Sequence, residues 1–501
     1  MSRTALLFIS RLENLRKSLA AIKPNVENLY IHLTTKNTEN TPTKWSKLIS
    51  KIYNDSFIVG SDMNVRILVS PLKCQSISNL LTGKIDLVYS DGKSDLCTEL
   101  LEKYKLTSQP IYLNDEAFGA LSSEEEADKI YKTVVLGGTF DRIHLGHKIL
   151  LTEAVLRATE RLVVGVTDES MVKSKKLYEL ILPVEERIKE VEVFLNEIDP
   201  TLKYDIVPIS DPFGPTKSDP DMDMIIVSKE TEKGGLKVNE LRKQNGLSEL
   251  DIFCIEVVES DECKDEIKEC KVSSSNKRID MLGTRLRPPV EKTNIPTEPY
   301  IIGMTGGIGS GKSRLCTRFQ AMGAYVIDCD KVAHDIYEPG QICYQKVVDA
   351  FGKDIVDPET SKIDRRKLGP IVFADPQKLE LLNSIVWPEL LIETKRRVAK
   401  VYEETKQKVF ILEAAILLKS GWDKEVHEVW STFVSPKEAT RRIMERNGFP
   451  KEEAEKRILS QLDNKSMIER SNIVFSTEWA VEITDRQAAK AWKIIKDELN
   501  L

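Results

Sequence analysis

The sequence lacks several features that would place a protein in a specialised class. Its eight cysteines are scattered without a Cys-x-x-Cys pair, which argues against a structural zinc site and for a reducing compartment. No run of about 18 apolar residues occurs, so we expect no transmembrane helix. There is no fixed-period repeat and no low-complexity tract. The formal net charge is -6, so the chain as a whole is not built to bind nucleic acid non-specifically.

The remaining composition is that of an ordinary globular protein. Of the 501 residues, 41% are hydrophobic and 30% are charged. This length allows about two to four domains. These properties predict a cytoplasmic protein, and the N-terminus, described below, leaves a mitochondrial association open.

The segment from residue 306 to residue 313 is the most specific motif. It fits the pattern G-x-x-x-x-G-K-[ST], in which backbone N–H groups of a glycine-rich loop surround phosphate oxygens. Its members are Gly306, Gly307, Ile308, Gly309, Ser310, Gly311, Lys312 and Ser313. An apolar, strand-like run precedes the loop and a helix-like stretch follows it. In this motif Lys312 reaches the outer phosphates, and the Ser313 hydroxyl holds a Mg²⁺ ion that accompanies ATP.

A second phosphate-binding signal lies upstream. A β-branched strand from residue 133 runs into Gly137-Gly138-Thr139-Phe140-Asp141, and His144-x-Gly146-His147 follows at the expected start of a helix. Only five histidines occur in the chain, and two of them stand here. A histidine can donate a hydrogen bond to phosphate without a permanent charge. The pattern predicts a second nucleotide site with a different chemistry.

Alternating strands and helices from Lys132 onward predict parallel sheets with crossover helices. Prolines between residues 288 and 299 mark a break before the second unit. The polar stretch 121–128 is typical of a linker. We therefore expect three parts: a small α/β region of unknown role (1–128), a nucleotide-binding domain (129–290) and a phosphate-loop domain (291–501). Because every candidate site residue follows Lys132, we expect the first part to be dispensable for the chemistry.

The N-terminus leaves alternatives open. Residues 1–23 carry five basic residues and one acidic residue, and their leucines fit one face of a helix. This pattern is typical of a mitochondrial address or of a helix that lies on a membrane surface. An ordinary opening helix of a folded domain is the other interpretation.

Taken together, the two motifs resemble the bifunctional coenzyme A synthases of animals. These enzymes join a phosphopantetheine adenylyltransferase to a dephospho-CoA kinase, and the resemblance covers residues 130 to 500. It implies a Rossmann-like nucleotidyltransferase domain followed by a P-loop kinase domain. The implied substrates are ATP, 4'-phosphopantetheine and dephospho-CoA.

In the first domain, the resemblance assigns the reacting phosphate to His147, and substrate or ATP contacts to the residues around it. Further contacts fall on a basic segment and on a Ser-Ser-Ser-x-x-[Lys/Arg] element. The full set of contacts is Gly138, Thr139, Phe140, His144, Lys173, Lys175, Ser273, Ser274, Ser275 and Arg278. The resemblance does not settle which of the two lysines contacts phosphate.

In the second domain, Asp330 of the Val-Ile-Asp-x-Asp element is the implied general base, beside Lys312 as the other catalytic residue. Arg365 stands in the substrate-side arginine element. Arg442, Arg446 and Arg457 fall in a segment that resembles a mobile lid, where guanidinium groups would hold the transferring phosphoryl group.

Two other hypotheses remain open. The chain could join another nucleotidyltransferase to a different nucleoside kinase, or it could be a nucleotide-binding scaffold without catalysis. The intact lysine, serine, aspartate and histidines argue against the scaffold, because a scaffold need not keep both sets of chemistry.

Overall fold

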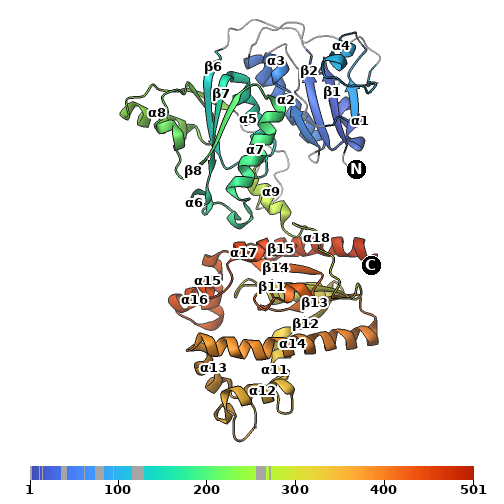
Figure 1. Ribbon diagram of the computed structural model, residues 1–501, viewed down its shortest axis with the longest axis vertical. Helices are drawn as coiled ribbons and strands as arrows, with labels where there is room; N and C mark the ends of the chain where they lie inside the picture. The colour runs from blue at the N-terminus through green and yellow to red at the C-terminus, as the bar shows by residue number, and fades with distance from the viewer. Residues whose placement is uncertain are drawn as a thin grey trace. The chain divides into compact units, whose positions relative to one another are not determined.

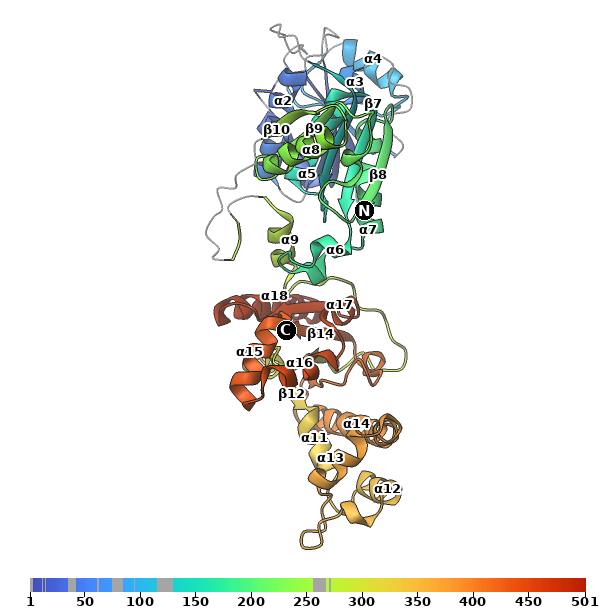
Figure 2. The same cartoon turned by 90° about the vertical axis from the view of Figure 1, so that its left-hand side faces the viewer.

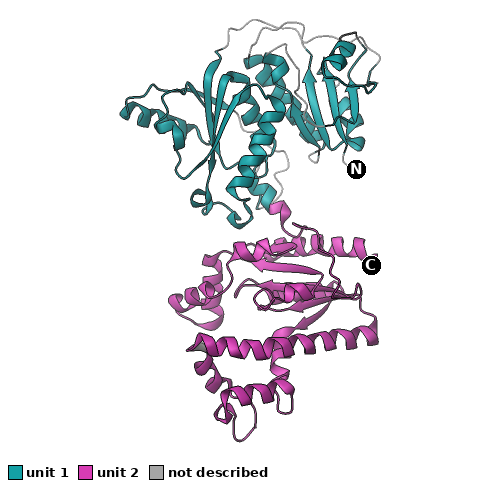
Figure 3. Cartoon of the chain, viewed as in Figure 1, with its two compact units in different colours: residues 1–278 teal, residues 279–501 magenta. Residues whose placement is uncertain are grey.

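The computed structural model describes residues 3–10, 12–13, 15–34, 42–60, 63–73, 84–93, 95–114, 129–255, 267–269 and 272–501. The chain divides into two compact units, residues 1–278 and 279–501 (Figure 3). The first unit contains two parallel five-stranded sheets and the second contains one. The predicted parallel α/β class is confirmed. The expected linker at 121–128 lies outside the described residues, and the division into three domains stays a prediction.

The first sheet has the strand order β3-β2-β1-β4-β5 and is parallel throughout. Its strands are β1 (Thr4–Ile9), β2 (Asn28–Leu33), β3 (Asn64–Ile67), β4 (Leu87–Ser90) and β5 (Ile111–Tyr112). Its helices are α1 (Leu15–Ile22), α2 (Pro42–Val59), α3 (Ser70–Lys73) and α4 (Asp95–Lys103). β1 is the central strand, so both of its faces are covered.

The helix predicted over residues 1–23 is wrong for its first half. Leu6, Leu7 and Ile9 lie in β1 and are buried, and only the second half forms a helix, α1. A central strand of a parallel sheet is apolar on both faces, and a short run of this kind cannot be told from a helix by its pattern. The leucines therefore form no membrane-binding face. A mitochondrial address stays a prediction. Among the described residues, no helix combines the length and apolar character needed to span a bilayer.

The second sheet has the order β10-β9-β6-β7-β8. If its strands are counted from β6, this order is the same as that of the first sheet counted from β1. Its strands are β6 (Tyr131–Gly138), β7 (Ala158–Thr167), β8 (Lys203–Ile209), β9 (Met224–Ser228) and β10 (Asp251–Ile255). Its helices are α5 (Leu145–Arg157), α6 (Glu169–Val172), α7 (Val184–Ile198), α8 (Glu232–Gln244) and α9 (Ser274–Met281). The chain leaves β6 at the carboxyl edge and enters α5 through the segment that carries the His-x-Gly-His motif.

The two sheets of the first unit share one hydrophobic core. A single cluster of buried residues runs from Ala5 and Leu7 in β1, through Ile49 of α2, to Val155 of α5 and Ile226 of β9. Helix α2 lies against α5, as Figure 1 shows. The core does not stop at the predicted boundary after residue 128, so removing the first sheet would expose apolar surface of the second.

The second unit is built on a sheet of order β12-β13-β11-β14-β15. Its strands are β11 (Tyr300–Gly306), β12 (Tyr325–Asp328), β13 (Val409–Glu413), β14 (Glu428–Phe433) and β15 (Ile473–Ser476). Its helices are α10 (Lys312–Ala321), α11 (Cys329–Asp335), α12 (Ile342–Phe351), α13 (Arg365–Phe373), α14 (Pro376–Thr405), α15 (Pro436–Asn447), α16 (Lys451–Leu459), α17 (Asn464–Glu469) and α18 (Val481–Leu499). Helices α14 and α18 lie on opposite sides of this sheet in both views (Figures 1 and 2).

Candidate active sites

The glycine-rich loop of the second unit joins the central strand β11 to α10. A Cβ atom on Gly306 would lie 2.2 Å from the Thr432 hydroxyl oxygen and 2.5 Å from that of Ser310, so the position accepts only glycine. Gly311 precedes α10 with a φ of 80°, in the left-handed region that favours glycine. The loop therefore leads into a helix N-terminus, where backbone N–H groups and the helix dipole attract phosphate.

Lys312 and Ser313 share a carboxylate that the sequence analysis did not select. Lys312 Nζ lies 2.7 Å from Glu413 Oε1, and the Ser313 hydroxyl donates to the same oxygen. Glu413 is 6% exposed and is the last residue of β13, the strand beside β11. An acidic residue directly after a buried strand was the available signal. The hydroxyl and carboxylate oxygens of Ser313 and Glu413 are the ligand type that Mg²⁺ prefers, so the residues present fit that ion.

These groups open onto a cavity of about 930 Å³. The whole loop from Gly306 to Ser313 lines it, and the exposed Asp330 faces it from the first turn of α11. Asp328, at the end of β12, caps α11 by accepting a hydrogen bond of 3.0 Å from the backbone N–H of Asp330. The candidate base is therefore held at the carboxyl edge of the same sheet that carries the loop.

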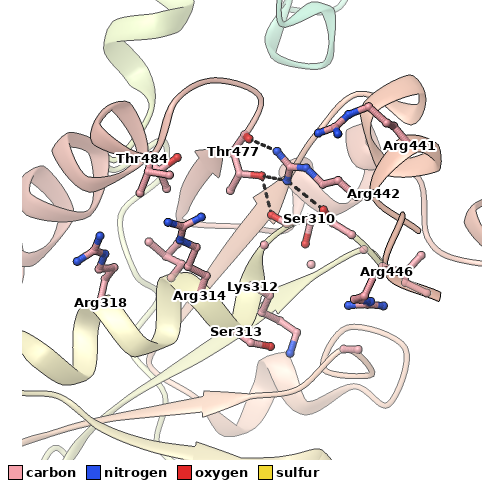
Figure 4. Close-up of a pocket in the computed structure, with 18 of the residues that line it drawn as sticks. Ser310, Lys312, Ser313, Arg314, Arg318, Arg441, Arg442, Arg446, Thr477 and Thr484 are labelled. Carbon is pink, nitrogen blue, oxygen red and sulfur yellow. Dashed lines mark hydrogen bonds between the residues drawn. The ribbon is translucent and has the colours of Figure 1, made fainter. Parts of the chain in front are cut away.

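Arg442 of α15 lies beside the loop and is already engaged. One of its terminal nitrogens donates to the Gly309 carbonyl at 3.1 Å and to the Thr477 hydroxyl at 2.8 Å. The Thr477 hydroxyl in turn donates to the Ser310 carbonyl at 2.8 Å, as Figure 4 shows. Glu438 accepts from Arg442 Nε at 2.8 Å. This arrangement fixes the back of the phosphate loop.

The other predicted arginines are divided. Arg446 lines the cavity, whereas Arg365 and Arg457 are not among the residues around it. Arg365 donates to His334 Nε2 at 3.1 Å, and Arg457 lies over the Phe449 ring and pairs with Glu453. Three arginines that sequence reasoning did not select also line the cavity: Arg314, Arg318 and Arg441. The cavity is therefore strongly basic, as a site for a polyphosphate requires.

A second cavity of about 790 Å³ opens at the carboxyl edge of the second sheet in the first unit. Predicted residues that line it are Gly138, Thr139, Phe140, His144, His147, Lys175, Ser273, Ser274, Ser275 and Arg278. Phe140 and Arg142 have φ angles of 50° and 51°, which non-glycine residues adopt rarely. Backbone strain of this kind concentrates at functional sites, where the surrounding structure maintains it.

The two histidine rings of the motif stack on each other, with centroids 3.8 Å apart. Burial holds the pKa of His144 well below its usual value, and the neighbouring His147 adds to the effect. Burial also lowers the pKa of His147 to about 3, with Lys277 and Lys175 contributing. Both rings are therefore neutral near pH 7. Among the described residues, the buried Nδ1 atom of each ring lacks a hydrogen-bond partner, which is typical of a site that awaits a ligand.

A buried ion pair supports this site from behind. Asp141 Oδ2 lies 2.7 Å from Arg278 of α9, and the two side chains are 0% and 1% exposed. The Asp141 backbone carbonyl accepts from the Ser274 hydroxyl at 3.1 Å, which ties the loop after β6 to the start of α9. Ser273 accepts from the Asn276 N–H at 3.2 Å. Arg278 thus lines the cavity, and its positive charge is largely neutralised by the ion pair with Asp141.

The two candidate lysines are placed differently. Lys175 lines the cavity, whereas Lys173 is not among the lining residues and directly follows α6. Removal from water lowers the pKa of Lys175, and Arg278 and Arg187 lower it further. A lysine surrounded by other cations gains most from an anionic ligand, so Lys175 is the better candidate for a phosphate contact.

Comparisons with known proteins match these two cavities. The model of the dephospho-CoA kinase family matches residues 300–481. The dephospho-CoA kinase of Carboxydothermus hydrogenoformans is 40% identical over 189 residues, which are 37% of this chain and 90% of that protein. The chain belongs to the dephospho-CoA kinase family. The dephospho-CoA kinase of Symbiobacterium thermophilum is 36% identical over 193 residues, covering 38% of this chain and 80% of the relative.

The first unit has a separate match. The model of a family described as cytidylyltransferase-like matches residues 135–280, which include the histidine motif and the serines at the start of α9. A Thermus thermophilus protein of solved structure is 28% identical, and the match covers 40% of this chain and 99% of that protein with a TM-score of 0.35. The chain therefore joins a nucleotidyltransferase-like domain to a domain of the dephospho-CoA kinase family, an arrangement that fits coenzyme A biosynthesis.

Proposed function

We propose that the chain is a bifunctional enzyme of the last two steps of coenzyme A synthesis. The first step transfers an adenylyl group from ATP to 4'-phosphopantetheine and gives dephospho-CoA and pyrophosphate. The second phosphorylates the ribose 3'-hydroxyl of dephospho-CoA and gives coenzyme A and ADP. The observation that carries the proposal is that one chain holds both a neutral histidine pair at a nucleotidyltransferase-like cavity and a complete phosphate loop in a dephospho-CoA kinase domain.

The first reaction needs alignment more than it needs a base. A phosphate oxygen of 4'-phosphopantetheine forms a bond to the α-phosphorus of ATP, and the bond to the pyrophosphate oxygen breaks. The attacker is already an anion, so the site must hold it in line and stabilise charge that grows on the phosphate oxygens. His147 and His144 can donate to these oxygens as neutral rings, and Lys175 can supply a positive charge.

The second reaction requires proton removal from an alcohol. Asp330 faces the cavity from the first turn of α11 and can accept the proton of the ribose hydroxyl as its oxygen attacks the γ-phosphorus. Lys312 lies at the start of α10, where it can neutralise charge on the outer phosphates of ATP. In this structure Glu413 holds Lys312 and Ser313 in place.

Magnesium is the cofactor that this chemistry implies. Ser313 would hold it together with the ATP phosphates, and Glu413 would orient the serine hydroxyl. When bound, Mg²⁺ neutralises charge on the phosphate oxygens. The described residues include no group of three His, Cys, Asp or Glu side chains placed to bind a metal.

The two alternatives predict different substrates or none. A fusion of another nucleotidyltransferase with another kinase would prefer a different nucleotide or acceptor, and an inactive scaffold would bind ATP without turnover. Purified protein should be offered ATP or CTP with 4'-phosphopantetheine or with nicotinamide mononucleotide, and separately ATP with dephospho-CoA or adenosine.

The proposal expects pyrophosphate release only with ATP and 4'-phosphopantetheine, and ADP release with dephospho-CoA. Equal or greater turnover with the other acceptors would favour the different fusion. Binding of ATP without any turnover would favour the scaffold.

A further inference from the structure

Among the described residues, those around the cavity of the histidine pair all fall between Gly137 and Arg278, and none comes from the N-terminal sheet. The sheet repeats the topology of the second sheet. At the equivalent place, the point where the strand order reverses beside the end of its first strand, Asp91 Oδ2 accepts from the Ser10 N–H at 2.7 Å, and Asp91 Oδ1 accepts from the Ser10 hydroxyl at 2.9 Å. This carboxylate ties the end of β4 to the end of β1.

The N-terminal sheet and its helices instead contact α5, the helix that begins directly after His144 and contains His147. Contacts with the N-terminal region follow α5 from its first turn to its last. The Lys148 ammonium group donates to Asn64 Oδ1 at 2.8 Å and to the Val65 carbonyl at 2.9 Å. Further along α5, the Thr152 hydroxyl lies 3.2 Å from the Tyr53 hydroxyl, Glu153 accepts from Ser46 at 2.5 Å, and the Val155 carbonyl accepts from Lys73 at 3.1 Å.

The contact between Tyr53 and Thr152 is buried and the others are partly buried, which limits competition from water. Tyr53, Thr152 and Glu153 are all at most 1% exposed. Burial lowers the pKa of Lys148 to about 7, with Arg66 and Lys277 contributing. Polar contacts in such surroundings are costly to break and fix one arrangement of the elements they join.

Lys148 is the residue next to His147, on the first turn of α5. His147 lies on that turn, and the Lys148 backbone N–H donates to the carbonyl of the N-cap residue His144 at 2.9 Å, so a shift of Lys148 moves both rings. A displacement of about 1 Å at a catalytic group can cost about 100-fold in rate.

We propose that the N-terminal sheet is a positioning element of the adenylyl-transfer site, and that Lys148, through Asn64 and Val65, is the positioning residue that sets the histidine pair. This inference rests on the proposed function of the first unit. It replaces the expectation that residues 1–128 are dispensable for the chemistry, because that expectation considered only where the reactive residues lie.

The test uses the full chain with Lys148→Met, which keeps the length of the side chain and removes its donors. The matched control is Lys132→Met, since Lys132 is an exposed lysine of β6. We expect adenylyl-transfer kcat to fall about 10-fold or more in Lys148→Met, with KM for both substrates within about 2-fold of the wild type. Phosphorylation of supplied dephospho-CoA should not change, and the control should match the wild type in both reactions.

Asn64 provides the other side of the same contact. Asn64→Ala should lower kcat in the same direction, whereas Asn64→Asp keeps an acceptor oxygen and should restore most of it. The double variant Lys148→Met with Asn64→Ala should be no slower than Lys148→Met alone, because both changes remove one contact. If Lys148→Met no longer unfolds cooperatively, the comparison of adenylyl-transfer kcat between Asn64→Ala and Asn64→Asp tests the inference in its place.

A second readout does not depend on the substrates. With only five histidines in the chain, the imidazole signals of His144 and His147 can be followed by nitrogen-15 NMR. They should shift in Lys148→Met and stay in place in Lys132→Met. A folded Lys148→Met variant with wild-type kcat and unshifted signals would overturn the inference. If the wild type makes no dephospho-CoA, the proposed function fails, and the imidazole signals alone then decide whether the sheet positions the histidines.

Discussion

Replacing Asp141 by asparagine should destabilise the first unit and stop adenylyl transfer. The carboxylate is fully buried and accepts from Arg278 at 2.7 Å, from Arg142 at 2.9 Å and from the Leu182 N–H at 3.2 Å. Asparagine keeps the shape but has no charge, so it leaves the buried guanidinium of Arg278 uncompensated. Breaking a buried ion pair from one side costs about 3–5 kcal/mol in the free energy of unfolding. With a slope of about 3 kcal/mol per molar urea, the midpoint should fall by about 1–1.7 M.

Pulse proteolysis in urea measures this change, with peptides from residues 129–278 read by mass spectrometry so that the two units are separated. Asp205→Asn is the matched control. Asp205 also pairs with an arginine, Arg161 at 2.6 Å, but both side chains are about one quarter exposed. Such a pair contributes about 0–1 kcal/mol. Equal midpoints for the two variants, or normal dephospho-CoA formation by Asp141→Asn, would refute the reasoning.

His147→Ala should slow adenylyl transfer by about 10²–10³-fold, because it removes one donor to the transition state. A coupled pyrophosphate assay would show this, and phosphorylation of supplied dephospho-CoA should be unaffected. Asp330→Asn should lower kinase kcat with little change in ATP binding by calorimetry, since an amide cannot accept the proton. Glu413→Gln should raise the Mg²⁺ concentration needed for half-maximal kinase activity by about 10–100-fold, because it weakens the orientation of Ser313; an unchanged Mg²⁺ titration would exclude that role. Because the folded pKa of His147 lies near 3, below its unfolded value near 6.5, the unfolded chain alone takes up a proton as the pH falls between these values. The contribution of this histidine to stability is therefore fully present above about pH 6.5 and is lost progressively below it. Its NMR signal should not titrate between pH 5.5 and 8, and a midpoint near 6.5 would contradict the burial argument.

Much of the fold could be predicted because most strands and helices are marked by short apolar or amphipathic runs in the sequence. The alternation of strands and helices predicted from Lys132 onward is present, as from β6 through α5 to β7 and from β9 through α8 to β10. β1 was missed because leucines at residues 6, 7, 12, 15 and 19 match a helix face as well as they match a buried strand followed by a helix. Only its pairing with β2 and β4, both distant in sequence, decides between them.

The sequence could group residues of a candidate site where they are consecutive, as in the phosphate loop and the histidine motif. It could not group residues that meet only because their strands are neighbours. Glu413 lies at the candidate site because β13 is the neighbour of β11. Lys175 lines its cavity and Lys173 does not, and only the course of the chain after α6 distinguishes the two lysines. The positioning role proposed for Lys148 could not be predicted for the same reason, since its hydrogen-bond partners lie more than 80 residues away in the sequence.

The central claim is that one chain carries out two successive reactions at two cavities. The most direct measurement is a time course with purified protein, ATP, Mg²⁺ and 4'-phosphopantetheine, in which all products are quantified by mass spectrometry. The account predicts that dephospho-CoA appears before coenzyme A, and that each coenzyme A formed is accompanied by one pyrophosphate and one ADP. Formation of ADP from supplied dephospho-CoA, with no pyrophosphate and no dephospho-CoA from 4'-phosphopantetheine, would contradict it.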